Sequence, residues 1–315
     1  MQFIYFAAAG ALLLVVGLFL FTHLYAYRIE AQFPAIGKFV DVGGFKMHYV
    51  DVPAGENSDL PPMIFIHGAS GNLRDQKLAF EEPLKGRGRM IFLDRPGHGY
   101  SERGGDGMNL PGKQAEAISA LMDSLKIPKA VIIGHSFGGA ITAAFAVHYP
   151  EKVKGLVFLA PATHPWPGGV SWYYDVAAKP LIGYLFTELL ALPAGLMKMK
   201  DGIKSVFSPN DPVPGYYQES GSELVLRPDV FRNNAHDVAA LRANVVKLSP
   251  RYSEIKAPTV IITGDSDDIV LAYIHSKGLE RDIDGAKLLE FKGVGHKPDY
   301  IVNKAAIEAI EDVSK

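Results

Sequence analysis

The order of apolar and polar positions along the chain predicts an alternation of strands and helices. Four short apolar runs have the length of strands that are buried on both faces, and they lie at residues 63–66, 90–93, 130–133 and 155–159. Residues 112–125 place apolar side chains on one face at helical spacing, and residues 138–148 form a small-residue helix that Pro150 ends. Because parallel strands need long crossover connections, this alternation predicts a parallel sheet covered by helices on both sides.

A hairpin of two strands, at residues 38–42 and 45–51, begins the predicted sheet. Two late strands, at residues 259–263 and 287–291, complete the sheet, and a closing helix follows at residues 301–313. Gly43 and Gly44 separate the first two strands, and glycine tolerates the positive φ that a tight turn requires. The sheet is therefore expected to start with an antiparallel pair.

Between the early and late strands, the regular pattern gives way to clusters of Pro, Gly and aromatic residues mixed with apolar helical stretches. We interpret residues 164–250 as an inserted cap, or lid. The folded core would then be formed by residues 31–163 together with residues 251–315.

The N-terminus carries an apolar segment without charge at residues 3–21, close to the roughly 20 residues with which a helix crosses the hydrocarbon core. A cleaved signal peptide is the competing interpretation, but no Lys or Arg precedes the segment and no small-x-small site follows it. We therefore expect residues 1–30 to form a single-pass membrane anchor. The flanking charges are too mixed to predict its orientation.

Composition narrows the classes of function. Charged residues make up 21% and apolar residues 48%, which is typical of a folded domain, and the net charge of -2 predicts no nucleic-acid partner. The chain has no cysteine, so disulfides, thiolate nucleophiles and cysteine-ligated zinc are excluded. The choice of partner must therefore depend on a local site rather than on the overall charge of the protein.

A candidate nucleophile lies in the stretch V-I-I-G-H-S-F-G-G at residues 131–139, where a buried strand runs directly into G-x-S-x-G and then into a helix. Side chains at Gly134 and Gly138 would obstruct such a sharp turn, so their absence lets it close. Ser136 is then expected to present its hydroxyl above the sheet. The alternative is a glycine-rich turn with an idle serine, and His135 is expected to point away and to pack.

A serine hydroxyl needs a base that a carboxylate orients, and in this arrangement the chain order is Ser, acid, His. Only His275 and His296 follow the late strand at residues 259–263. His275 lies in an amphipathic stretch that suits a surface or packing role. His296 follows the last strand in a glycine-bearing loop, and we predict that it is the base.

Three carboxylates compete for the role of the acid, since Asp265, Asp267 and Asp268 all follow the late strand. The spacing G-x-x-D-x-I-V is most like that of related sequences and selects Asp267. The alternative is that Asp265 or Asp268 serves. The calcium pattern D-x-D-x-D-G-x5-E is absent, so we expect no metal and no cofactor.

Two backbone N–H groups are expected to receive the oxyanion that forms on the attacked carbonyl. One belongs to Phe137, directly after the serine. The other is predicted at Ala69, in the loop His67-Gly68-Ala69-Ser70-Gly71 that follows an early strand. The alternative for this loop is an ordinary turn at the end of a strand.

Five stretches together resemble the α/β-hydrolase superfamily. They read I-F-I-H-G-A-S at 64–70, L-D-R-P-G-H-G-Y-S at 93–101, G-H-S-F-G-G at 134–139, G-D-S-D-D-I-V at 264–270 and G-V-G-H at 293–296. The resemblance extends from Lys38 to the C-terminus apart from the cap. It implies an α/β-hydrolase fold, with a mostly parallel eight-stranded sheet, helices on both faces and an inserted helical cap.

The resemblance also implies an activity. The second stretch looks like that of epoxide hydrolases and haloalkane dehalogenases, but those enzymes are known for an aspartate where this chain has Ser136, which argues against both activities. With serine, the central expectation is a lipase-like serine esterase that cleaves a small-molecule ester through an acyl-enzyme. A carbon–carbon bond hydrolase and a cofactor-free haloperoxidase or perhydrolase are alternatives that use the same three residues.

The aromatic residues of the cap suggest a lipophilic acyl or aryl ester, with Trp166, Trp172 and Tyr173 as candidate substrate-binding residues. Core packing is an equally good explanation for any one of them. The alternative from another class is a membrane-anchored binding protein that kept the fold and lost turnover.

Overall fold

The computed structural model describes all residues 1–315 and confirms the mostly parallel sheet. Its strands are β1 (Lys38–Asp41), β2 (Lys46–Val52), β3 (Met63–Ile66), β4 (Met90–Leu93), β5 (Ala130–His135), β6 (Val153–Leu159), β7 (Thr259–Gly264) and β8 (Lys287–Phe291). They form one eight-stranded sheet in the order β1-β2-β4-β3-β5-β6-β7-β8. Only β2 runs antiparallel to its neighbours, because it follows β1 in a hairpin. The strand order and directions therefore match the sheet that the resemblance implies.

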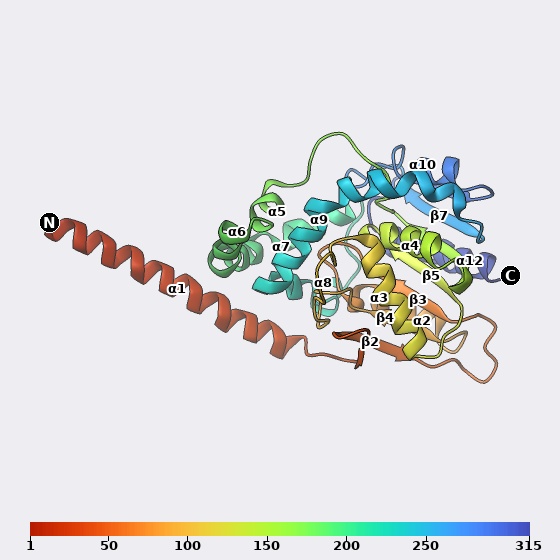
Figure 1. Ribbon diagram of the computed structural model, residues 1–315, viewed down its shortest axis with the longest axis horizontal. Coiled ribbons are helices and arrows are strands. Elements are labelled where there is room, and N and C mark those ends of the chain that lie inside the picture. The colour runs from red at the N-terminus through yellow and green to blue at the C-terminus, as the bar shows by residue number, and fades with distance from the viewer.

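Helices cover both faces of this sheet, as Figure 1 shows. Those of the core are α2 (Leu73–Leu84), α3 (Pro111–Ser124), α4 (Phe137–His148), α10 (Ser276–Asp282), α11 (Pro298–Ile301) and α12 (Asn303–Ser314), with the 3-10 helices η1 (Pro150–Lys152) and η4 (Ser249–Glu254). The predicted closing helix over residues 301–313 corresponds to α12, and the short helix α11 precedes it. The predicted helix over residues 112–125 corresponds to α3.

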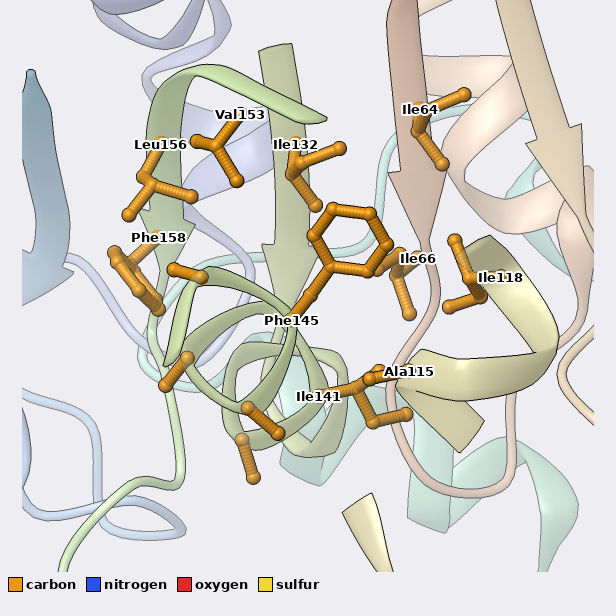
Figure 2. Close-up of a cluster of buried hydrophobic side chains, with 14 of the residues drawn as sticks. Ile64, Ile66, Ala115, Ile118, Ile132, Ile141, Phe145, Val153, Leu156 and Phe158 are labelled. Atoms are coloured by element: carbon orange, nitrogen blue, oxygen red, sulfur yellow. The ribbon is translucent and has the colours of Figure 1, made fainter. Parts of the chain in front are cut away.

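The central strands are apolar throughout because each buries both of its faces. In β3, Ile64 and Ile66 pack in one cluster with side chains of α3 and α4, and this cluster is drawn in Figure 2. Met63 and Phe65 point the other way and pack in a second cluster with residues of α2 and α12. Since successive side chains of a strand alternate between faces, a continuous apolar run is what a sheet covered on both sides requires.

Between β6 and β7 the chain leaves the sheet and forms the helices of the segment that we interpreted as a cap. They are α5 (Trp172–Ala177), α6 (Pro180–Phe186), the π-helical turn η2 (Thr187–Ala191), α7 (Leu192–Phe207), α8 (Tyr216–Glu219), η3 (Ser222–Leu226) and α9 (Pro228–Leu248). A buried ion pair ties α9 to the core, because Arg95 Nη1, after β4, lies 3.0 Å from Asp237 Oδ2. Breaking a buried pair of this kind is strongly destabilising, since it leaves one charge without a partner.

The N-terminal helix α1 (Gln2–Gln32) is longer than the apolar segment predicted at residues 3–21. Its apolar part projects away from the body (Figure 1) and buries nothing against it. From Thr22 onward the helix packs on the cap, where Ile29 is buried and His23 Nε2 lies 2.8 Å from Glu188 Oε2 of η2. By length and composition, α1 is able to cross a membrane.

His275 links the two segments that leave β6 and β7. Its Nδ1 accepts hydrogen bonds from the backbone N–H groups of Thr163, at 3.1 Å, and of His164, at 3.0 Å. A ring nitrogen that faces two donors must be unprotonated. Burial, with a further contribution from nearby His164, lowers the pKa of His275 to about 4.

The folded-state pKa of His275 lies below its ordinary value. Between pH 6.5 and about 4, His275 is therefore protonated in the unfolded chain but not in the folded chain. The stability that the neutral ring contributes is complete above pH 6.5 and is lost as the pH falls, by up to about 3 kcal/mol. We expect His275→Asn, which keeps an acceptor but does not titrate, to weaken this loss of unfolding free energy. Urea unfolding at pH 7, 6, 5 and 4 measures it.

The control for this experiment is His148→Asn, a substitution of an exposed histidine that makes no side-chain hydrogen bond. It should leave the pH dependence as it is in the wild type. If the His275→Asn protein and the wild type lost the same amount of unfolding free energy on acidification, the proposed contribution of neutral His275 to stability would be contradicted.

Candidate active site

The turn between β5 and α4 holds Ser136 in a strained conformation. Its φ is 53°, a left-handed value that few residues other than glycine adopt, and its N–H donates to the carbonyl oxygen of Leu159 at 2.9 Å. A Cβ on Gly134 would lie 2.2 Å from Thr142 Oγ1, and one on Gly138 would lie 2.3 Å from the carbonyl oxygen of Ile66. Gly134 therefore lets α4 pack closely on β5, and Gly138 lets α4 approach the end of β3. The Ser136 hydroxyl is presented at the carboxyl edge of the sheet.

Three polar side chains form a continuous hydrogen-bonded chain at the carboxyl edge of the sheet. His296 Nε2 lies 2.9 Å from Ser136 Oγ, and His296 Nδ1 lies 2.7 Å from Asp267 Oδ2. The other carboxylate oxygen, Asp267 Oδ1, accepts the N–H groups of Ile269 and Val270 at 2.9 Å each. The carboxylate is thus held in place from both sides, and all three members are almost fully buried.

The two competing carboxylates lie elsewhere. Asp265 is exposed and its Oδ1 accepts the N–H of Gly293 at 2.7 Å, a bond that, with the Ser266 hydroxyl, lowers the pKa of Asp265. Asp268 is exposed and makes no side-chain hydrogen bond. Of the three, only Asp267 contacts His296.

The backbone N–H groups of Ala69 and Phe137 donate to no acceptor within the protein. The loop after β3 lies directly against the serine, because a Cβ on Gly68 would be 3.0 Å from Ser136 Cβ. Two unsatisfied donors beside a nucleophile are what a developing oxyanion needs.

Buried His67 shapes this loop. Its Nδ1 donates to the carbonyl oxygen of Gly68 at 2.8 Å, and its Nε2 accepts the N–H of Arg95 at 3.0 Å. One nitrogen donates and the other accepts, so the ring is neutral. Burial and the charge of Arg95 hold the pKa of His67 well below its usual range, which keeps this arrangement over the physiological pH range.

Sequence reasoning missed Asn234 of α9. Its Oδ1 accepts the N–H of Ser70 at 2.7 Å, and its Nδ2 donates to Ser70 Oγ at 3.0 Å. Ser70 follows Ala69 directly and has a φ of 56°. A cap helix therefore holds the loop that carries one of the candidate oxyanion donors, and no motif in the sequence points to this asparagine.

A buried charge cluster beside His296 was also missed. Lys297 is 1% exposed, and its Nζ lies 2.9 Å from Asp75 Oδ2 and 2.9 Å from Asp299 Oδ2. Burial opposes its charge, but Asp299 and Asp75 more than compensate and raise the pKa of Lys297. Asp75, His135 and Asp299 are close enough together to suggest a metal site, yet the ammonium group of Lys297 already supplies a cation to both carboxylates.

His135 connects the same region to the backbone of His296. Its Nε2 donates to the carbonyl oxygen of His296 at 2.8 Å, so it contacts the backbone of His296 and makes no hydrogen bond to Ser136. Burial and nearby Lys297 keep the pKa of His135 well below its usual value.

The three candidate substrate-binding residues occupy different positions. Tyr173 packs against Tyr174, whose hydroxyl lies 3.2 Å from Ser70 Oγ beside the site. Trp166 packs at the edge of the core cluster, with its ring centroid 5.8 Å from that of His275. Trp172 is 68% exposed, so in this structure it does not line a closed pocket.

Comparisons with known proteins agree with this fold. The model of the alpha/beta hydrolase fold family matches residues 61–298. A 2-hydroxy-6-oxononadienedioate/2-hydroxy-6-oxononatrienedioate hydrolase of Escherichia coli (strain K12 / DH10B) is 27% identical over 257 residues, which cover 80% of this chain and 84% of the relative.

Two solved structures share the fold. One is the 2-hydroxy-6-oxo-6-phenylhexa-2,4-dienoate hydrolase from Rhodococcus sp. strain RHA1, with a TM-score of 0.70, 20% identity and coverage of 88% of this chain and 98% of that chain. The other is an esterase from Exiguobacterium antarcticum, with a TM-score of 0.68, 21% identity and coverage of 89% and 100%. Because the family match spans most of the chain, this protein belongs to the alpha/beta hydrolase fold family and is a hydrolase.

The close approach at Gly138 yields a stability prediction. Gly138→Ala forces a methyl group against the backbone of β3, so we expect it to lower the free energy of unfolding by about 2 kcal/mol or more. The matched control is Gly112→Ala in α3, where the added Cβ would be 3.5 Å from His148, an ordinary contact. It should leave stability unchanged or raise it by up to about 1 kcal/mol.

Urea unfolding of both variants, followed by circular dichroism, measures the difference. Coincident unfolding curves for the two alanine variants would show that the approach of α4 to β3 is not tight.

Proposed function

We propose that this protein is a serine-dependent hydrolase in which Ser136 attacks a carbonyl carbon. The observation that carries the proposal is the hydrogen-bonded chain from Ser136 Oγ through His296 to Asp267. His296 takes the serine proton as the hydroxyl adds to the carbonyl. Asp267 holds the imidazole in the tautomer that leaves Nε2 free to accept, and it stabilises the imidazolium that forms.

In this mechanism, the carbonyl oxygen becomes an oxyanion that the N–H groups of Ala69 and Phe137 receive. His296 then gives its proton to the leaving group, and the bond from the carbonyl carbon to that group breaks. Water, deprotonated by His296, attacks the acyl-enzyme and releases a carboxylic acid, which restores Ser136.

For the leaving group, our first candidate is a carbon atom, so that the reaction hydrolyses a carbon–carbon bond next to a ketone. Two similar proteins support this choice. The Escherichia coli relative, which matches most of the chain, and the fold neighbour from Rhodococcus are both named as hydrolases of 2-hydroxy-6-oxo acids. The bond breaks when the departing carbon is stabilised as an enol or enolate and is protonated. The products are a carboxylic acid and a second carbonyl compound.

A carboxylic ester is the second candidate, and a specific feature favours it. Tyr173, Tyr174, Phe186 and Phe231 form an aromatic group in the cap, with ring centroids 4.4 to 6.4 Å apart, that would suit a lipophilic acyl or aryl group. The fold is also shared with an esterase. The same three residues serve both reactions, so the substrate alone distinguishes them.

We further propose that α1 anchors the enzyme in a membrane through its uncharged segment at residues 3–21. The proposal is supported by the length of the helix and by the absence of protein contacts along this segment.

The first test uses an alkyl fluorophosphonate, which labels an activated serine. We expect the wild type to be labelled and Ser136→Ala to be unlabelled, with kcat lowered on the order of 10⁴-fold or more. Asp267→Asn should retain the fold and lower kcat by about 10⁴-fold, since the imidazole loses its tautomer.

The control is Ser205→Ala, which removes an exposed serine of α7. It should be labelled like the wild type. Labelling that survives Ser136→Ala would point to another nucleophile, and no labelling of the wild type would favour a binding protein without turnover.

The second test separates the two leaving groups. Purified protein is incubated in ¹⁸O-water with a 2-hydroxy-6-oxo-dienoate, a 1,3-diketone and a series of p-nitrophenyl esters, and the products are identified by mass spectrometry. Carbon–carbon hydrolysis predicts one ¹⁸O in the released acid, an unlabelled leaving fragment at early times, and no reaction with Ser136→Ala. Turnover of the esters alone would select the second candidate.

A further inference from the structure

Large apolar side chains are exposed together on one end of the cap. They lie on α5, α6 and η2 and comprise Trp172, Leu181, Ile182, Leu185 and Leu190, which we call the cap face. Leu181 is 71% exposed and Ile182 is 58% exposed. Because α6 contacts both α5 and η2, these side chains lie on neighbouring elements, and exposed apolar side chains that gather on a folded protein mark an interaction site.

The cap face lies beside the point where α1 reaches the body. Thr22 is fully buried, and the adjacent His23 pairs with Glu188 of η2 at 2.8 Å. Residues 1–21 precede this point and, at 1.5 Å per residue, measure about 31 Å along the helix. This length equals the roughly 30 Å thickness of a bilayer core. A bilayer spanned by these residues therefore ends at the level of η2.

Figure 1 shows α6 at the end of the body from which the free part of α1 projects. The cap face is thus at the level of the predicted bilayer surface and on the side that the anchor enters. A second copy of the chain is the other conceivable occupant, but the anchor places lipid next to this face in every copy.

The apolar stretch Pro180–Phe207, which contains α6, η2 and α7, is itself long enough to span a membrane, yet 28% of its apolar window is buried in the protein. Ion pairs hold η2 against its neighbours, because Glu188 contacts both His23 and Arg232 of α9. The stretch is therefore fixed to the cap and suited to lying in the plane of the interface.

We propose that the cap face docks onto the surface of the lipid bilayer that α1 spans. The segment from α5 to α7 exposes four lysines (Lys179, Lys198, Lys200 and Lys204) and two aspartates (Asp175 and Asp201). The exposed apolar side chains drive the docking and this small excess of positive charge is secondary, so a zwitterionic phosphatidylcholine bilayer suffices. The inference rests on the proposed anchor.

Docking also gives the aromatic group of the cap a connection to the membrane. Trp172, on the cap face, has its ring centroid 6.0 Å from that of Tyr173 and 6.1 Å from that of Phe186. Tyr173 packs against Tyr174, which contacts Ser70. A continuous row of aromatic contacts thus joins the cap face to the loop beside Ser136.

The absence of cysteine makes a direct test possible, since a single introduced cysteine is labelled without competition. Full-length Ile182→Cys is labelled with a nitrobenzoxadiazole dye and placed in phosphatidylcholine nanodiscs with one chain per disc. We expect a blue-shifted emission that brominated acyl chains quench. The matched control is Val246→Cys on α9, 49% exposed, whose label should report water and resist quenching.

Adding Leu181→Ser and Leu185→Ser to the Ile182→Cys protein should shift its emission to that of the control. An Ile182→Cys label that reports water in single-chain discs would overturn the proposal, and a blue shift that develops only with two chains per disc would overturn it in favour of a second copy. Retention in the membrane after alkaline extraction tests the anchor separately. Fluorophosphonate labelling of Ser136 tests the hydrolase separately, so each failure is distinguishable.

Discussion

The close contact of two backbones is the constraint on which the site depends. The start of α4 approaches the end of β3 so closely that a single methyl group at Gly138 would meet the carbonyl oxygen of Ile66 at 2.3 Å. This approach places the Phe137 N–H, the Ser136 hydroxyl and the loop after β3 side by side. The strained φ of Ser136 persists because the surrounding packing and hydrogen bonds determine it.

Around this contact, the site is held mainly by buried polar groups. Neutral His67 and His135 each fix a backbone segment, while Lys297, next to His296 in the chain, neutralises Asp75 and Asp299. Such groups contribute little net stability in comparison with apolar packing, but they permit few alternative arrangements. The design suits a reaction in which the donors and the base must be oriented before the substrate arrives.

Much of this architecture was predictable from the sequence, because the residues that identify the turns and the candidate site follow directly after apolar strand segments. Apolar runs located the parallel strands, and the glycines beside Ser136 and His296 located the turns that face one edge of the sheet. What could not be predicted depends on contacts between distant segments. The sequence gives no periodic signal that Lys297 is buried, that Asn234 reaches Ser70, or that α1 continues to Gln32 to pack on the cap.

The bond from Asn234 to Ser70 couples the cap to the loop after β3. Asn234 belongs to a helix of the cap, whereas Ser70 belongs to the loop that carries the Ala69 N–H. Displacement of α9 would therefore remove the partner that orders this loop. In the mechanism that we propose, the position of one cap helix thus determines the position of one oxyanion donor.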